Sequence, residues 1–171
     1  NADIMQSPME IPFGNLTLAN FHKAFTSQTF NIISGYLTST WITVTSGFFI
    51  ILISSMSSYI LARNKTHLFK GIFYYFIIGL MLPSSVLLLP LLKLLTGLHL
   101  IHTTYGLILV NIGAYMPFTL FLYTGFVRTI SEHLDESAKI DGANIFTTFW
   151  RIIFPLLRPA TGAIVIFLFI F

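Results

Sequence analysis

Three long stretches of this sequence contain no Asp, Glu, Lys or Arg: residues 36–61, 71–92 and 103–127. A helix that crosses the hydrocarbon core of a bilayer needs about 20 mostly apolar residues, each rising about 1.5 Å. All three stretches are long enough. The strands of a membrane barrel would be about half as long and would alternate polar and apolar residues, which these stretches do not do. The sequence therefore predicts an all-α membrane protein, a polytopic helical bundle.

The composition agrees with a chain that is surrounded by membrane lipid. Hydrophobic residues make up 55% of it and charged residues only 9%, whereas a soluble domain carries about 25% charged residues. The lack of cysteine excludes disulfides and thiolate metal sites. The net charge of +3 comes from scattered Lys and Arg that form no basic stripe, so nucleic acid is not an expected partner.

The Lys and Arg residues identify the cytoplasmic side. Most of them lie in two of the segments between apolar stretches, namely Arg63, Lys65, Lys70, Arg128, Lys139, Arg151 and Arg158. Short loops rich in Lys and Arg stay in the cytoplasm. We therefore expect residues 128–159 to be cytoplasmic and the polar residues 1–35 to form an external segment. The last apolar run, residues 160–171, is too short to cross, and the chain does not begin with Met, so we expect a fragment of a longer protein.

Polar residues recur every four positions in the third stretch: Asn111, Tyr115 and Thr119. This spacing puts them on one face of a helix, and polar side chains at this depth face protein or a water-filled path rather than lipid. Helix packing and a substrate path both account for the pattern, and packing is the simpler explanation. The first stretch is rich in Ser and Thr, which we expect to pack against other helices.

Two prolines, Pro83 and Pro90, interrupt the second stretch. Proline removes a helix hydrogen bond and clashes with the preceding turn. Within a membrane the freed carbonyls are satisfied by neighbouring helices or by a cavity. The pair predicts either a passive kink or a bend beside a translocation path, and the sequence leaves both open.

The segment between the third stretch and the final apolar run has the pattern of two short helices. Ser131 can cap a helix over residues 132–141, Gly142 suits the left-handed position that ends it, and Asn144 can cap a second helix over residues 145–154. The apolar side of the second helix is expected to hold Ile145, Phe149, Ile152 and Ile153. Without a partner that side would be exposed, as at a docking surface.

The charged residues of the first of these helices are expected to face water. Glu132, Asp135 and Glu136 would form an exposed acidic face. Asp135 and Lys139, at i and i+4, would give the helix modest support.

The order Glu136-Ser137-Ala138, three residues, Gly142, nine residues and Ile152-Ile153-Phe154-Pro155 resembles the cytoplasmic signature of the permease subunits of ATP-binding-cassette importers. That signature is Glu-Ala-Ala, three residues, Gly, nine residues and Ile-x-Leu-Pro, so only Ser137 and Phe154 depart from it. The resemblance implies a type I importer transmembrane domain over residues 36–171, with about 3.5 of six spans. It assigns docking on a separate ATPase to Glu136, Ser137, Ala138, Asp141, Gly142, Ile152 and Pro155.

Further stretches are similar to the carbohydrate permeases of the maltose-transporter type: Tyr59-Ile60-Leu61-Ala62-Arg63, Asp141-Gly142-Ala143, and Met81-Leu82-Pro83 followed by Leu89-Pro90. This resemblance implies half of the translocation path of a binding-protein-dependent importer of a sugar or oligosaccharide, multi-pass in a bacterial cytoplasmic (inner) membrane. The implied partners are a second homologous permease subunit, two ATP-binding subunits and an extracytoplasmic sugar-binding protein. ATP and Mg would lie on the ATP-binding subunits, because this chain lacks the Gly-x4-Gly-Lys-Ser/Thr phosphate cradle. The chain itself would then be no enzyme and would bind no cofactor.

Two other classes of protein stay open as alternatives. An ion-coupled secondary transporter usually carries Asp, Glu or His inside its spans, and the three stretches have none, although backbone carbonyls alone can hold sodium. A membrane enzyme would have to use His99 and His102 or the carboxylates of residues 128–159. A metal pair on a helix calls for i,i+4 spacing and a third ligand, so no metal site is expected.

Overall fold

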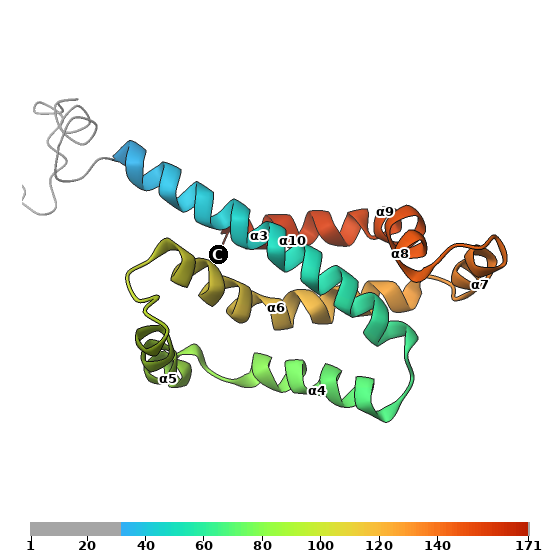
Figure 1. The fold of residues 1–171 in the computed structure, drawn as a ribbon, viewed down its shortest axis with the longest axis horizontal. Helices are drawn as coiled ribbons and strands as arrows, with labels where there is room; N and C mark the ends of the chain where they lie inside the picture. The colour runs from blue at the N-terminus through green and yellow to red at the C-terminus, as the bar shows by residue number, and fades with distance from the viewer. Residues whose placement is uncertain (1–31, 171) are drawn as a thin grey trace, which may run out of the picture. The chain divides into compact units, whose positions relative to one another are not determined.

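The computed structural model describes residues 32–170, and every regular element within that range is a helix (Figure 1). The chain falls into two compact units, residues 1–40 and residues 41–171. Of the first unit only residues 32–40 are described, and they form the opening turns of α3 (Ile32–Arg63). The predicted external segment, residues 1–35, therefore lies mostly outside the described residues, and its last residues are already helical.

The two longest described helices are α3 and α6 (Thr104–Thr129). After α3 come α4 (His67–Met81), α5 (Ser84–Gly97) and then α6. Short helices follow: α7 (His133–Ile140), α8 (Ile145–Thr148), the π-helix η2 (Phe149–Ile153) and α9 (Phe154–Leu156), and then α10 (Arg158–Ile170). α3 and α6 are each long and apolar enough to cross a membrane alone. The predicted all-helical fold class is confirmed.

The second apolar stretch is divided in two. The axes of α4 and α5 meet at 109°, and together the two helices have the length and composition of one broken span. α4 ends at Met81 because the ring of Pro83 disfavours the α-region for the residue before it, and Leu82 accordingly has an extended ψ of 122°. Pro90, in contrast, lies inside α5. The interruption predicted for residues 71–92 is therefore present, and of the two prolines it is Pro83 that breaks the helix.

Small polar side chains close the interface between α3 and α6. The hydroxyl oxygens of Ser54 and Thr119 lie 2.8 Å apart, and Ser58 Oγ donates a hydrogen bond to the Leu120 carbonyl at 3.0 Å. The side chains of Ser54, Ser58 and Thr119 are fully buried. Small residues let membrane helices approach closely and bond across the interface. The expectation that the Ser and Thr of the first stretch pack against another helix is confirmed for Ser54 and Ser58.

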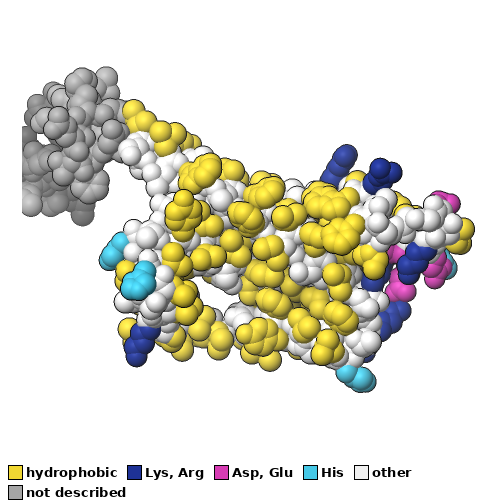
Figure 2. Space-filling model, viewed as in Figure 1, with side chains coloured by type: hydrophobic (Ala, Val, Ile, Leu, Met, Phe, Trp, Pro, Cys, Tyr) yellow, Lys and Arg dark blue, Asp and Glu magenta, His cyan; other side chains and the backbone are white. Residues whose placement is uncertain are grey.

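An apolar cluster joins the long helices to the short ones. Its buried members are Ile50, Tyr59, Tyr123, Val127, Phe149, Ile153, Leu157, Ala160, Ile164 and Leu168. Because η2 contributes two of these residues, the short helices share a core with α3, α6 and α10. Acidic side chains, together with most Lys and Arg, gather where α7 and α8 lie, whereas apolar side chains cover the helices elsewhere (Figure 2).

Candidate docking site

The helix α7 begins one residue later than the sequence predicted. Its N-cap is Glu132, which already has helical angles, φ −66° and ψ −20°, and makes no side-chain cap bond. Ser131 Oγ accepts a hydrogen bond from the His133 N–H at 3.3 Å. The predicted Ser131 cap is therefore wrong in register, although its hydroxyl still satisfies one of the free N–H groups of the first turn.

The turn after α7 is fixed by Gly142. Its φ is +81°, the left-handed region that favours glycine, so the predicted positive φ is confirmed. The Gly142 N–H donates to the Lys139 carbonyl at 3.0 Å, and the Ala143 N–H donates to the Ala138 carbonyl at 2.9 Å. These bonds satisfy carbonyls that the end of a helix leaves free. The chain can therefore reverse within a few residues at the tip of the segment.

The second half of the segment is helical, but it is not one regular α-helix. Asn144 Oδ1 accepts from the Thr147 N–H at 2.8 Å, which confirms the predicted cap. After α8 the chain widens into η2, where the Phe154 N–H reaches back to the Phe149 carbonyl. In an α-helix the ring of Pro155 would clash with the carbonyl four residues earlier, and the wider π-turn relieves that contact.

The π-turn also changes which side chains face outward. The sequence predicted one apolar side with Ile145, Phe149, Ile152 and Ile153, and this is wrong. Phe149 and Ile153 are buried in the core cluster, whereas Ile145 is 63% exposed. Ile152 lies between these extremes.

Three large apolar side chains are exposed at the tip of the segment, and we call them the docking patch: Ile140, Ile145 and Phe146. They are 86%, 63% and 65% exposed. Exposed Glu136 and Lys139 lie on α7 beside them, and Glu136 Oε2 is 3.0 Å from His133 Nδ1. An exposed apolar group with polar neighbours is typical of a surface that binds another protein.

The structure divides the residues predicted to dock into two groups. Glu136, Ser137, Asp141 and Gly142 are exposed. Ala138 is buried, and Ile152 and Pro155 are half-buried. The first group is available to a partner, while the second group holds the segment against the core.

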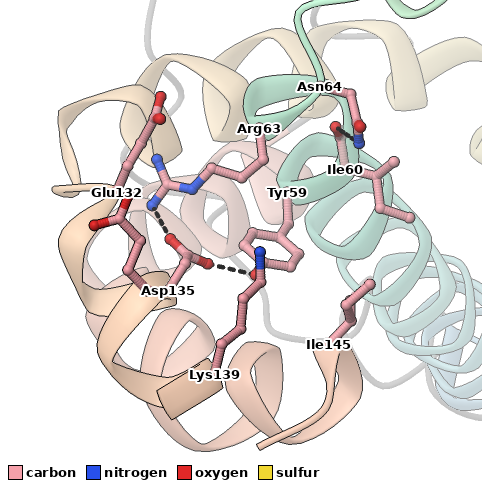
Figure 3. A pocket seen from close by; sticks show the side chains of 9 residues that line it. Tyr59, Ile60, Arg63, Asn64, Glu132, Asp135, Lys139 and Ile145 are labelled. Carbon is pink, nitrogen blue, oxygen red and sulfur yellow. Dashed lines mark hydrogen bonds and ion pairs between the residues drawn. The ribbon is translucent and has the colours of Figure 1, made fainter.

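Asp135 is a further residue of this site that the sequence prediction placed wrongly. It is 7% exposed instead of solvated. Its Oδ2 lies 2.8 Å from Arg63 Nη2, and its Oδ1 accepts a hydrogen bond from the Tyr59 hydroxyl (Figure 3). The predicted pair with Lys139 is therefore wrong, because the carboxylate turns toward the end of α3. We call Tyr59, Arg63 and Asp135 the Asp135 network.

One feature of the sequence points to this network. Tyr59 and Arg63 are separated by four positions, so they share one side of α3, and both belong to the stretch that resembles sugar permeases. Asp135 immediately precedes Glu136. The contact itself joins residues far apart in the chain, and no local pattern reports such a contact.

A cleft lies beside the network, with a volume of about 370 Å³ (Figure 3). Its lining consists of Tyr59, Ile60, Arg63, Asn64, Glu132, Asp135, Glu136, Lys139 and Ile145. At its edge Lys65 Nζ is 3.1 Å from Glu132 Oε1. The hydrogen bond and the charge of Lys65 lower the pKa of the Glu132 carboxyl. The small contribution of this exposed carboxylate to stability is therefore lost as the pH falls through its lowered pKa.

The polar residues of the third stretch all lie against α3, as one shared helix face predicts, but they do not all line one cavity. Thr119 is fully buried against Ser54 in the α3–α6 interface, so helix packing accounts for it. Asn111 and Tyr115 are half-buried and line a cavity of about 60 Å³ together with Thr43, Ser46 and Leu168. In the described part of the chain, no group of His, Asp and Glu side chains is arranged to hold a metal ion.

Comparison with known proteins finds relatives that are named as permease proteins of transport systems. The chain is 35% identical over 153 residues to the melibiose/raffinose/stachyose import permease protein of Bacillus subtilis (strain 168), covering 89% of this chain and 55% of the relative. It is 37% identical over 171 residues to the arabinooligosaccharides transport system permease protein of the same organism, covering 97% of this chain and 56% of the relative. The chain thus spans about half the length of the curated relatives it matches.

A solved structure and a family model match the chain as well. A crystal structure of a bacterial ABC transporter involved in the import of the acidic polysaccharide alginate matches with a TM-score of 0.78 at 19% identity, over 90% of this chain and 53% of that chain. This likeness concerns the fold. The model of the family described as binding-protein-dependent transport system inner membrane component matches residues 51–171. The chain therefore belongs to the family of binding-protein-dependent transport system inner membrane components.

Proposed function

We propose that the protein containing this chain is a permease subunit of an ATP-driven, binding-protein-dependent importer. The chain forms half of the translocation path and couples to a separate ATPase through residues 132–155. The observation that carries this proposal is the docking patch. It presents three exposed apolar side chains on a segment whose other face is buried in the core, at the charged end of the helices (Figure 2).

The surroundings of the patch suit a protein partner better than lipid. Ile140 and Ile145 flank the turn at Gly142, and Glu136 and Lys139 are exposed on the helix just before it. Charged groups so close to the apolar side chains would be costly inside hydrocarbon. At a protein interface, apolar contacts form the centre and charged groups form a polar rim. The arrangement therefore fits a groove on a water-soluble ATPase.

The proposed complex supplies what this chain does not. Two ATP-binding subunits hold ATP and Mg, a second homologous permease subunit forms the other half of the path, and an extracytoplasmic sugar-binding protein delivers the substrate. The family description, which names binding-protein-dependent transport and an inner membrane component, supports these partners. In this arrangement residues 128–159 face the cytoplasm and residues 1–35 face outward, and the chain acts as a transport subunit without catalytic residues.

We infer that the substrate is a sugar or oligosaccharide. Both Bacillus subtilis relatives carry names that refer to sugars or oligosaccharides. Asn111 and Tyr115, which line the 60 Å³ cavity, are our candidates for the path, because an amide can bond a sugar hydroxyl and a tyrosine ring can stack on its apolar face. Thr119 is no longer a candidate, since its hydroxyl is engaged within the α3–α6 interface.

The test is uptake by the full-length permease, assembled with its ATPase and binding protein in liposomes. Uptake of raffinose, melibiose and arabino-oligosaccharides is measured with and without internal ATP, and with an ionophore that removes proton and sodium gradients. We expect uptake that requires ATP and is insensitive to the ionophore. Uptake without ATP that is abolished by the ionophore would instead establish the ion-coupled secondary transporter.

A further inference from the structure

The end of α3 is joined to the start of α7 by a buried ionic contact. The side chains of Arg63 and Asp135 are only 15% and 10% exposed, and their charged groups are 2.8 Å apart. The Tyr59 hydroxyl donates to the other carboxylate oxygen. Charge-assisted bonds in such surroundings are among the stronger contacts in proteins, and breaking one leaves a buried charge without a partner.

Arg63 also holds the end of α6. Its Nη1 donates to the Ile130 carbonyl at 3.0 Å and to the Val127 carbonyl at 3.4 Å. These carbonyls belong to the last turn and C-cap of α6, where cations are favoured by the helix dipole. One planar guanidinium therefore bonds α6 and α7 at once, which the single ammonium of a lysine could not do with the same geometry.

Tyr59 contacts both halves of residues 132–155, which we call the docking segment. Its hydroxyl bonds Asp135 in α7, and its ring packs on Phe149 of η2 with the ring centroids 5.7 Å apart. Phe149 is 2% exposed. A displacement of either half relative to α3 would therefore have to break the hydrogen bond or separate two packed rings.

We propose that Tyr59, Arg63 and Asp135 are positioning residues for coupling: they make α3 follow the docking segment when the ATPase moves it. This inference rests on the proposed function. Close-packed interfaces shift between discrete arrangements instead of deforming continuously, so a buried network that ties α3, α6 and α7 together makes their ends move as one body. The Lys65 and Glu132 pair joins the same two regions, but its side chains are 74% and 54% exposed, and exposed pairs of this kind contribute little.

The first experiment measures whether the two ends stay together. Residues 1–171 contain no cysteine. Once any cysteines elsewhere in the full-length complex have been replaced, Asn64→Cys just after α3 and Lys139→Cys on α7, both exposed, can be spin-labelled in the assembled complex. We expect the distance between the labels to change by less than about 2 Å between nucleotide-free and ATP-trapped states, the scale of small helix shifts at interfaces. A larger change in the otherwise native complex overturns the proposal.

The second experiment measures substrate transported per ATP hydrolysed, at equal amounts of assembled complex. We expect this ratio to fall by about fivefold or more in Asp135→Asn, the lower end of usual coupling effects. Tyr59→Phe, which keeps the ring on Phe149, should lower it less. The control Lys65→Gln removes the exposed pair without touching the network and should leave the ratio unchanged.

A network with a merely structural role would give another result. Less complex would assemble, but each assembled complex would keep the native ratio, and that outcome overturns the proposal. If Asp135→Asn does not assemble, Tyr59→Phe and the distance measurement decide. The proposed function fails separately, since then the native complex itself shows no ATP-driven uptake.

Discussion

At the scale of single residues, Gly142 is needed for the backbone conformation of the segment, whereas Glu136 is not needed for the fold. Gly142 is required by the backbone: it has positive φ, whereas an added Cβ would meet no atom of the described residues within 4 Å, so space is not the reason. Glu136 is not required by the fold, because its side chain is 65% exposed and contacts only the exposed His133 among the described hydrogen bonds and ion pairs. The first residue shapes the segment, and the second is available to a partner.

Gly142→Val should impair docking through strain. The left-handed conformation costs a branched residue about 1–2 kcal/mol or more, and this strain would shift the turn that carries Ile140 and Ile145. The measurement is the amount of ATPase subunit that co-purifies with the full-length permease. Gly142→Asn is the control, because asparagine tolerates positive φ. Native co-purification of the valine variant would show that the turn does not matter for docking.

Glu136→Lys should uncouple ATP hydrolysis from uptake. We expect Glu136 to meet a basic residue of the ATPase, and loss of one partner of a desolvated pair costs about 2 kcal/mol or more. The assay compares uptake with ATP hydrolysis in the same liposomes. A reversed charge on the matching ATPase residue should restore coupling, and native coupling in Glu136→Lys alone would remove this residue from the interface.

At the scale of elements, the turn before α6 depends on a close backbone approach. A Cβ added to Gly106 would lie 2.3 Å from the Leu100 carbonyl oxygen. The Gly106 N–H bonds Thr103 Oγ1 at 3.0 Å, which in turn donates to the same Leu100 carbonyl at 2.7 Å. The start of α6 is thus fixed by a compact set of bonds that leaves no room for a side chain.

Two alanine substitutions in α6 should therefore act in opposite directions. Gly106→Ala must push the backbone or the Leu100 carbonyl away, and we expect it to lower the melting temperature of the full-length permease in detergent. Gly113→Ala meets no atom of residues 32–170 within 4 Å and should stabilise by about 0.4–1 kcal/mol, because the unfolded chain loses freedom. Equal effects of the two substitutions would contradict the turn geometry.

The sequence predicted the elements that depend on local patterns. The apolar helices, the cap at Asn144 and the positive φ of Gly142 follow from composition, capping chemistry and backbone sterics. The burial of Asp135 comes from contacts with Tyr59 and Arg63, which lie far away in the chain, and a single sequence does not display such contacts. The break at Pro83 and the π-turn before Pro155 follow from local proline sterics, but the same residue type is tolerated inside α5 at Pro90, so proline alone does not tell where a helix breaks or widens.

At the scale of the whole molecule, the proposed orientation in the membrane rests on the distribution of Lys and Arg along the sequence and can be measured. Lys139, on α7, and Lys93, on α5, are both exposed. In intact cells a membrane-impermeant thiol reagent should label Lys93→Cys, whereas Lys139→Cys should react only after the membrane is opened. The reason is that positively charged loops stay in the cytoplasm. Labelling of Lys139→Cys from outside would reverse the proposed orientation.

The central claim is that the docking patch binds the ATPase, and site-specific photo-cross-linking tests it most directly. A photoreactive amino acid replaces Phe146, which is 65% exposed on the patch. In the control it replaces Tyr105, which is 74% exposed in the first turn of α6, at the opposite end of that helix from α7. After illumination of the assembled complex, mass spectrometry identifies the protein attached at each position. We predict the ATP-binding subunit at Phe146 and not at Tyr105. Attachment of the ATP-binding subunit at Tyr105, or its absence at Phe146 in a complex that imports with ATP, would contradict the claim.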